Sequence, residues 1–272
     1  MTASPTVSLA AEPIGTFFGL TITNSIISGW IVTLSLLVCA YFLRRALVSI
    51  PGRVQAAVEL AYDYFYSSSI QVIGREDVAR ELFPFVMTQF FFILLSNWSG
   101  LLPGLSSIHV QQGVKQVPLF RAPTSDLNTT LALAAITVLY MQYLAIKHTG
   151  AKAYFHRFFN FENPILFIVG LAEIISETMR IVSFGFRLFG NIFAGEVLIS
   201  VIFFLMIAFL PYVAILPLPF FLIELFVGVI QAYIFCFLTI VFTGVAVADH
   251  GSTPHSPSLH PTKQPSNHME TV

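Results

Sequence analysis

Residues 164–210 read PILFIVGLAEIISETMRIVSFGFRLFGNIFAGEVLISVIFFLMIAFL, an apolar stretch that is interrupted by a few charged side chains. At ~1.5 Å per residue one helix of this length is ~70 Å long, which is more than twice the ~30 Å hydrocarbon core of a bilayer. Proline opens the stretch at Pro164 and does not recur before Pro211, so no residue inside it forces a break. We therefore expect a single long helix that crosses a membrane at a steep tilt.

The composition of the whole chain also points to a membrane protein. Of its 272 residues, 56% are hydrophobic and only 10% are charged, and the mean hydropathy is +0.80. Soluble domains carry about 25% charged residues, so this chain lacks the side chains to cover a water-facing surface. Its net charge of −1 offers no basic surface to nucleic acid, and its two cysteines stand alone in apolar runs. A soluble enzyme, a nucleic-acid binder and a disulfide-stapled secreted domain are therefore disfavoured.

Four further apolar runs are long enough to cross a bilayer. They lie at about 26–43, 83–102, 127–146 and 218–247. The segment 50–82 mixes charges with apolar residues at helical spacing, which predicts an interfacial amphipathic helix followed by a loop. The expected fold is thus an all-α membrane protein with about five crossing helices, of which the last two are long and tilted.

The domain organisation follows from the same runs. We expect one polytopic membrane domain over residues 26–248, preceded by an external segment over residues 1–25. Residues 249–272 are rich in Ser, Pro and His without periodicity, which predicts a disordered cytoplasmic tail.

Basic residues near the span ends predict the orientation of the chain, because cytoplasmic loops carry an excess of Lys and Arg. With five crossings, nine basic residues fall on one side, within 44–80, within 147–157 and at Lys263, whereas only Lys115 and Arg121 fall on the other. The N-terminus is therefore expected outside and the C-terminus in the cytoplasm. Arg180 and Arg187 remain, since both lie inside the long fifth span.

Ionisable side chains inside a span cost about 2.5–3.5 kcal/mol each on insertion scales, so they mark candidate functional sites. The fifth span contains Glu173, Glu177, Arg180, Arg187, Asn191 and Glu196. At 100° per residue, the first five lie within about 40° of Glu173 around the helix axis and form one stripe, whereas Glu196 lies off it. On the last span Glu224 and Gln231 share one face, with Gly228 between them.

These charges have both a structural and a functional interpretation. Glu173 or Glu177 is suitably spaced to pair with Arg180, and such a pair is as consistent with a purely structural role as with a functional one. Arg187 differs, because its nearest acid on the stripe, Glu177, lies ~15 Å away along the axis. An arginine stays protonated, so Arg187 predicts a carboxylate that is supplied from elsewhere.

Small residues follow Arg187 along the same helix. Gly190, Ala194 and Gly195 allow another helix to approach closely within lipid. We therefore expect the charged stripe to face a second protein surface, to which Arg187 is presented.

Several classes of site are excluded by what the sequence lacks. The seven histidines fall outside the predicted spans, which excludes a transmembrane haem or copper centre held by histidine. The chain has no H-E-x-x-H motif and no G-x-x-x-x-G-K-[ST] motif, so we expect no metal, no cofactor and no direct nucleotide binding.

Five segments together resemble a known family. They are RLFGNIFAGE (187–196), IELFVGVIQAYIF (223–235), IPGRVQAAVE (50–59), FPFVMTQFFFILLSNWSGLLPG (83–104) and PTSDLNTT (123–130). Taken in chain order, they resemble subunit a of the F-type ATP synthase over roughly residues 24–248. The R-L-F-G-N-x-x-A-G-E run with a downstream E-x6-Q is highly specific.

The resemblance implies a stator subunit that forms two offset half-channels against a ring of c subunits. It also implies contact with the peripheral stalk of b subunits and a bacterial inner membrane. Such a chain is not an enzyme on its own but part of a proton-translocating complex. Arg187 matches the essential arginine of the family, which attracts the carboxylate of each c subunit.

The resemblance assigns the other polar residues by position. Glu196 and Glu224 match the outer half-channel, Asn191 and Gln231 would order water or orient Arg187, and Glu173 with Ser183 would line the exit half-channel. Arg180, with its neighbour Glu177, falls where the family often has a basic residue and is auxiliary.

One departure from the family concerns the coupled ion. Many members pair a carboxylate with a histidine at the positions of Glu196 and Glu224, whereas this chain has Glu at both. Whether both carry protons stays open, and Na⁺ remains a less favoured alternative to H⁺.

Two competing functions remain at this point. A stand-alone secondary transporter or channel would use the same charges, but it usually shows broken helices and an internal repeat, and the sequence shows neither. A passive assembly subunit would use the charges only to hold helices together.

Overall fold

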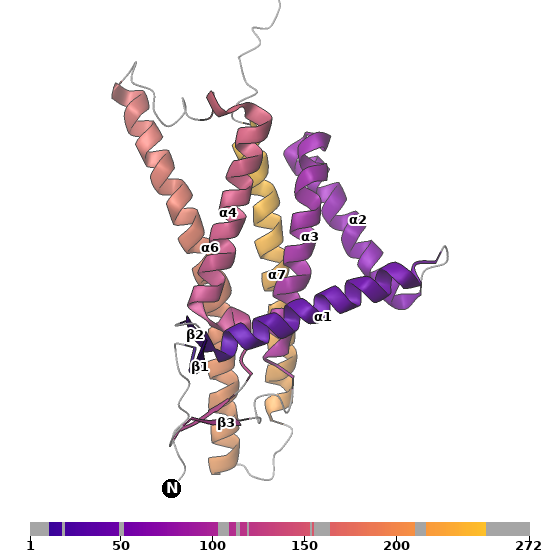
Figure 1. Cartoon of the computed structure of the whole chain (residues 1–272), viewed down its shortest axis with the longest axis vertical. Coiled ribbons are helices and arrows are strands. Elements are labelled where there is room, and N and C mark those ends of the chain that lie inside the picture. Colours follow the sequence, from indigo (N-terminus) through magenta and orange to yellow (C-terminus); the bar gives the residue numbers. More distant parts are fainter. Residues whose placement is uncertain are drawn as a thin grey trace, which may run out of the picture.

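The computed structural model describes residues 11–17, 20–48, 52–102, 109–112, 115–118, 120–152, 154, 164–209 and 216–248. Its helices are α1 (Asn24–Ala46), α2 (Arg53–Ile73), α3 (Glu76–Ser99), α4 (Leu127–Thr149), α6 (Pro164–Phe209) and α7 (Pro217–Ala248) (Figure 1). All of these except α2 are long and apolar enough to cross a membrane. The prediction of an all-α membrane protein with about five crossing helices is confirmed.

Two short β-ribbons and one 3₁₀ turn were not predicted. β1 (Pro13–Phe17) pairs antiparallel with β2 (Leu20–Thr23), and β3 (His109–Gln112) pairs antiparallel with β4 (Lys115–Pro118). The turn η2 covers Pro123–Ser125, directly before α4. Strands of four or five residues contain too few alternating positions to give a clear pattern in the sequence.

The loop that was expected after the amphipathic helix is absent, and α3 begins at Glu76 instead of residue 83. Gly74 adopts a left-handed conformation with φ of 69°, and its N–H binds the carbonyl of Ile70 at the end of α2. Glu76 and Asp77 occupy the first turn of α3, where the helix dipole favours negative charge. A single glycine therefore reverses the chain, and the charged residues start the next helix.

The helix α2 is buried on one side only. Phe65, Ser69 and Ile73 are its buried residues, and α2 packs against α3 and α7. Leu60, on the opposite side, is 72% exposed. This distribution agrees with the predicted amphipathic character, and placement at the membrane interface remains a proposal.

The two last helices are the longest. α6 has 46 residues and runs unbroken, which gives ~69 Å, and α7 has 32 residues, which gives ~48 Å. By contrast, the 23 residues of α1 reach ~35 Å, close to one bilayer thickness. In Figure 1, α1 runs obliquely across the bundle that contains α4, α6 and α7. If α1 stands along the membrane normal, the crossing angle means that α6 and α7 are strongly tilted.

The helix α7 forms the centre of the packing, because it contacts α2, α3, α4 and α6. Glycines allow backbones to approach at two of the crossings. A Cβ on Gly228 of α7 would lie 3.2 Å from the Cβ of Asn97 on α3, and one on Gly185 of α6 would lie 2.6 Å from Leu131 Cδ2 on α4. These two contacts fix the positions at which α7 and α6 meet the earlier helices.

Candidate functional site

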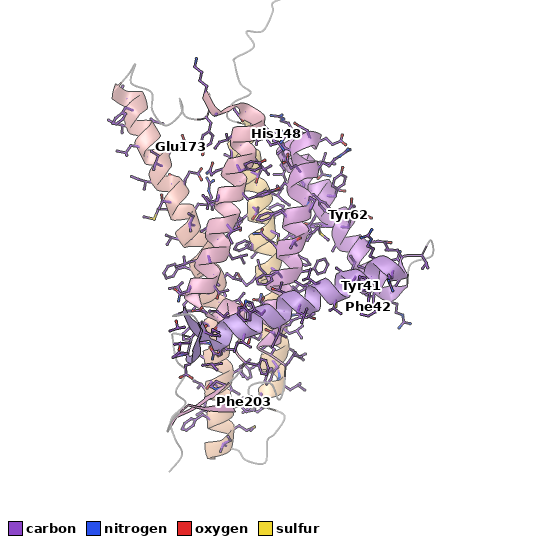
Figure 2. The ribbon with its side chains drawn as sticks, in the orientation of Figure 1. Tyr41, Phe42, Tyr62, His148, Glu173 and Phe203 are labelled. Atoms are coloured by element: carbon purple, nitrogen blue, oxygen red, sulfur yellow. The ribbon has the colours of Figure 1, made fainter. Side chains whose placement is uncertain are left out.

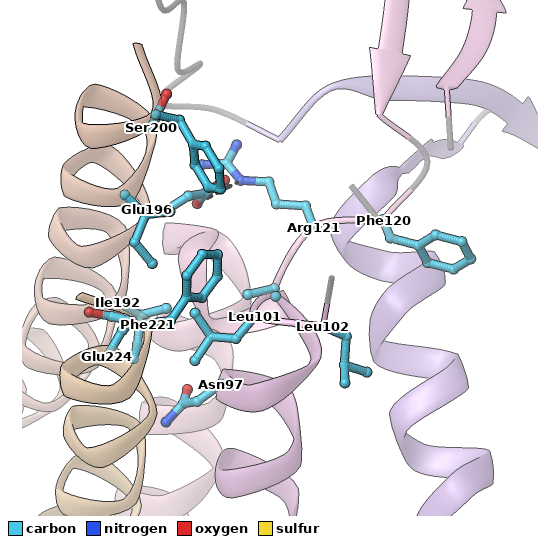
Figure 3. A pocket seen from close by; sticks show the side chains of 14 residues that line it. Asn97, Leu101, Leu102, Phe120, Arg121, Ile192, Glu196, Ser200, Phe221 and Glu224 are labelled. Carbon is cyan, nitrogen blue, oxygen red and sulfur yellow. Dashed lines mark ion pairs between the residues drawn. The ribbon is translucent and has the colours of Figure 1, made fainter. Parts of the chain in front are cut away.

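A cavity of about 470 Å³ lies where α6 and α7 meet the end of α3 and the segment before α4 (Figure 3). Most of its lining is apolar. Its polar lining residues are Asn97, Arg121, Glu196, Ser200 and Glu224. Figure 3 shows the side chain of Arg121 reaching across the cavity toward Glu196. The cavity therefore brings together the two acids that the sequence placed on different helices.

The guanidinium of Arg121 is the cation of this cavity. The residue is only 8% exposed, and its Nε lies 3.5 Å from Glu196 Oε2. The same Nε donates to Ser125 Oγ at 2.9 Å, and the backbone N–H of Arg121 donates to Ser28 Oγ on α1 at 3.2 Å. These bonds hold Arg121 in place from two different segments of the chain.

Arg121 was not predicted to belong to the site, because in the sequence it appears as an ordinary basic residue of an external loop. The available signal was its position five residues before a polar N-cap, Asp126, in a segment of small residues. Small side chains allow the segment to fold back between helices. A Cβ on Gly100, for example, would lie 2.7 Å from Ala122 Cβ.

The carboxylate of Glu224 packs directly against Gly195 of α6. Glu224 is 8% exposed, and a Cβ added to Gly195 would overlap its carboxyl group. This corrects one expectation, because Gly195 faces a side chain of α7 and not a second protein. The absence of a side chain at Gly195 is what lets Glu224 lie beside α6, next to Glu196.

Asn97 of α3 links the cavity to the helix crossing. Its Nδ2 donates to the carbonyl of Gly228 at 2.9 Å, and its Oδ1 accepts from Thr124 Oγ1 at 2.7 Å. The neighbouring Trp98 donates from Nε1 to the carbonyl of Leu225 at 3.2 Å. Asn97 lies in a segment that resembles the family, but no pattern in the sequence distinguishes it from the other polar residues there.

Arg187 lies on the exposed side of α6, outside this cavity. Its Nη2 donates to Ser183 Oγ at 3.4 Å, and within the described part of the chain it forms no ion pair. Gly190, Asn191 and Ala194 are exposed on the same side. Glu224 packs at Gly195, ~12 Å further along the helix, so the structure does not bring Glu224 to Arg187.

Glu177 and Arg180 form a pair inside the helix bundle. Arg180 Nη1 lies 2.9 Å from Glu177 Oε2, and its guanidinium lies 4.3 Å from the ring centroid of Phe242 on α7. Gln142 of α4 also donates to Glu177. Because the pair joins α4, α6 and α7, the geometry favours the structural interpretation for these two residues.

Glu173 and Gln231 complete the set of predicted residues. Figure 2 shows Glu173 toward the end of the molecule at which His148 lies, whereas Phe203 lies toward the opposite end. Glu173 is half-buried, and Gln231 is buried on the same face of α7 as Glu224 and Gly228. Along α6, Glu173 and Glu196 are ~35 Å apart, and Arg187 lies between them.

Comparison with known proteins gives a consistent result. The sequence profile of the family described as ATP synthase A chain matches residues 26–244. The chain is 34% identical over 229 residues to the ATP synthase subunit a of Moorella thermoacetica, covering 84% of this chain and 93% of that protein. It is also 34% identical over 227 residues to the ATP synthase subunit a of Gloeobacter violaceus, covering 84% of this chain and 85% of that protein. This multi-pass membrane protein therefore belongs to the ATP synthase A chain family.

Proposed function

We propose that this chain is the proton-conducting stator subunit of the membrane sector of the ATP synthase. The observation that carries the proposal is Arg187, an exposed cation on a membrane helix without an ion-pair partner among the described residues. A charged side chain inside a membrane span is energetically costly unless an opposite charge lies beside it. The partner of Arg187 is then the carboxylate of a ring of c subunits that rotates past α6.

Arg187 acts as a fixed charge and does not transfer protons. Its guanidinium cannot lose its proton near neutral pH, but it stabilises an ionised carboxylate that faces it. The carboxylate releases its proton as it approaches Arg187 and takes up another after it has passed. Only the neutral carboxyl group then turns toward lipid, where an ionised one would be costly.

Two half-channels deliver and remove these protons. The outer one is the cavity with Glu196, Glu224 and Arg121, to which Gln231 contributes from the same face of α7. The inner one begins at Glu173 and Ser183, on the other side of Arg187 along α6. Asn191 is exposed one turn after Arg187 and orders water or orients the guanidinium. With Arg187 between the two half-channels, protons pass only by way of the rotating ring.

The outer cavity favours H⁺ over Na⁺ as the coupled ion. A sodium site needs several oxygen ligands around one position. Here the guanidinium of Arg121 lies 3.5 Å from Glu196 and already supplies a positive charge to the acids. A Na⁺ ion bound beside Arg121 would be repelled, whereas a proton neutralises a carboxylate without needing a set of oxygen ligands.

The proposal includes the surroundings of the chain. The peripheral stalk of b subunits holds it against the torque of the ring, and the chain is not an enzyme by itself. We further propose that the chain lies in a bacterial inner membrane, and the distribution of Lys and Arg supports an N-terminus outside and a C-terminus in the cytoplasm.

Reconstitution tests this function against that of a stand-alone transporter. The chain alone and the complete ATP synthase are placed in separate liposomes under a potassium-diffusion potential, and internal pH is followed with a fluorescent dye. We expect proton flux with the complete complex and none above empty liposomes with the chain alone. Equal flux per chain in both preparations would identify a self-contained channel. Flux that requires Na⁺ would show that the coupled ion is Na⁺ and not H⁺.

Replacing Arg121 tests the outer half-channel. We expect Arg121→Gln to lower ATP-driven proton pumping about tenfold, equivalent to ~1.4 kcal/mol, because it removes the cation that lies 3.5 Å from the carboxylate of Glu196. Arg121→Lys keeps the charge and is expected to retain most activity. Arg80→Gln, which breaks an exposed ion pair with Glu76 on α3 outside the cavity lining, is the matched control. Equal rates for Arg121→Gln and Arg80→Gln would exclude a role for the Arg121–Glu196 ion pair.

A further inference from the structure

A second hollow lies on another side of the molecule, between α2, α3 and α7. It has a volume of about 810 Å³ and extends along α2 from Arg53 to Phe65, which is ~18 Å. Its other walls are formed by Phe90 to Leu94 of α3 and Val229 to Tyr233 of α7. We call this hollow the α2 groove.

The lining of the α2 groove is almost entirely apolar. Its polar groups are the guanidinium of Arg53 and the hydroxyls of Tyr64 and Tyr233, and the two hydroxyls bind each other at 2.7 Å. The groove therefore has one charged end, at Arg53, and mainly apolar walls along the rest of its length. Such a surface excludes stable filling by water, which needs several polar partners.

Arg53 belongs to a group of cations at the corner between α1 and α2. Gln55 holds this corner together, because it accepts from the backbone N–H of Val48 at 3.3 Å and donates to the carbonyl of Val48 at 3.0 Å. Arg44 and Arg45 end α1 directly before this contact, and they are exposed like Arg53.

These three guanidinium groups are not neutralised within the described residues. Glu59 is the nearby acid on α2, and it accepts from Gln55 at 2.7 Å. None of the three arginines forms an ion pair in the described part of the chain. The mouth of the groove therefore carries an exposed positive charge at Arg53.

We infer that the α2 groove binds an anionic phospholipid, with an acyl chain between α2, α3 and α7 and the headgroup phosphate at Arg53. The groove is ~18 Å long, and an extended acyl chain reaches about half of the ~30 Å hydrocarbon core, so one acyl chain fits along it. Basic residues at the mouth of a pocket between membrane helices attract anionic headgroups. One molecule with an anionic end and an apolar chain satisfies both parts of the site.

A transmembrane helix of another protein fits the same surface less well. Helices that associate in lipid approach through small residues, whereas this groove is lined mainly by Phe, Leu, Val, Ile and Tyr, with Ala57 and Ala61 the small exceptions. An apolar helix would also leave Arg53 without an anion.

Photolabelling of the complete ATP synthase tests the inference. The complex is placed in nanodiscs that contain phosphatidylglycerol or phosphatidylcholine with a diazirine on one acyl chain, and adducts are mapped by mass spectrometry after irradiation. We expect phosphatidylglycerol adducts on the lining residues of α2, α3 and α7, at least fivefold above those of phosphatidylcholine.

Variants separate the headgroup from the acyl chain. Arg53→Gln removes one surface cation and is expected to lower phosphatidylglycerol labelling about fivefold. Arg53→Lys keeps the charge and is expected to keep the labelling. Ala61→Trp fills the groove and is expected to abolish labelling. The control Leu34→Trp adds the same ring on α1, where Leu34 is 63% exposed and lies outside the groove.

Two results would overturn the inference. Equal labelling by the two lipids would show that the headgroup is not recognised. Adducts that are absent from the groove, together with cross-links from a cysteine at Ala61 to another subunit, would show that a protein helix occupies it instead.

Discussion

Arg187→Ala is expected to abolish ATP-driven proton pumping, with a loss of at least ~100-fold in inverted membrane vesicles. Removing one partner of a charge pair in a low-dielectric site costs ~3–5 kcal/mol, and each ~1.4 kcal/mol is a factor of ten in rate. In the proposed mechanism, a ring carboxylate that passes α6 without the guanidinium has no cation to stabilise its ionised form. The pumping rate per assembled complex is the measurement, together with the ATPase activity of the soluble sector.

The matched control is the other arginine of α6. Arg180 lies two turns earlier, pairs with Glu177 at 2.9 Å and stacks on Phe242. We expect Arg180→Ala to reduce the amount of assembled complex but to leave pumping per complex within about twofold, since its role is packing. If both variants lose pumping per complex equally, Arg187 is not required for pumping more specifically than Arg180. If Arg187→Ala pumps normally, the proposed mechanism is wrong.

Gly195→Ala is expected to lower pumping at least tenfold without changing any charge. The new methyl group would overlap the carboxyl group of Glu224, and overpacking of this kind costs ~1–3 kcal/mol. Glu224 then has to leave its place beside Glu196, and the outer cavity loses its pair of acids. Vesicle pumping per complex again gives the result.

Two further variants make this test specific. Gly29→Ala adds the same methyl group inside α1, where the nearest atom, Pro123 Cβ, is 3.9 Å away. We expect it to pump normally. The double variant Gly195→Ala with Glu224→Asp shortens the acid and is expected to recover part of the loss. Equal activity of Gly195→Ala and Gly29→Ala would show that the position of Glu224 does not matter.

The sequence was sufficient for the architecture because membrane insertion depends mainly on local properties. Length and hydropathy placed the long helix that begins at Pro164, and the absence of an internal proline predicted that it would be unbroken. The angular position of Arg187 on that helix follows from helical periodicity alone. Its exposure depends on packing as well, because Arg180 lies on the same stripe of α6 and yet pairs with Glu177 inside the helix bundle.

The cavity was only half predictable, because it depends on contacts between distant segments. Glu196 and Glu224 were visible as charges inside spans, but their approach depends on Gly195, whose role was assigned to a different surface. Arg121 was hidden because a loop segment has no periodicity from which to infer burial. Only the folded chain brings residue 121 to residue 196.

The order of synthesis gives the packing of α7 a consequence for biogenesis. Asn97 leaves the ribosome 131 residues before the carbonyl of Gly228 that accepts its hydrogen bond, and Arg121 likewise precedes Glu196. Until α6 and α7 are inserted, the nascent chain therefore presents these two side chains to the lipid or to the insertion machinery without those later partners. Chains that stop before α7 lack the helix that contacts α2, α3, α4 and α6. Such truncated chains should be recognised by membrane proteases, so that quality control removes incomplete subunits before they meet a rotor.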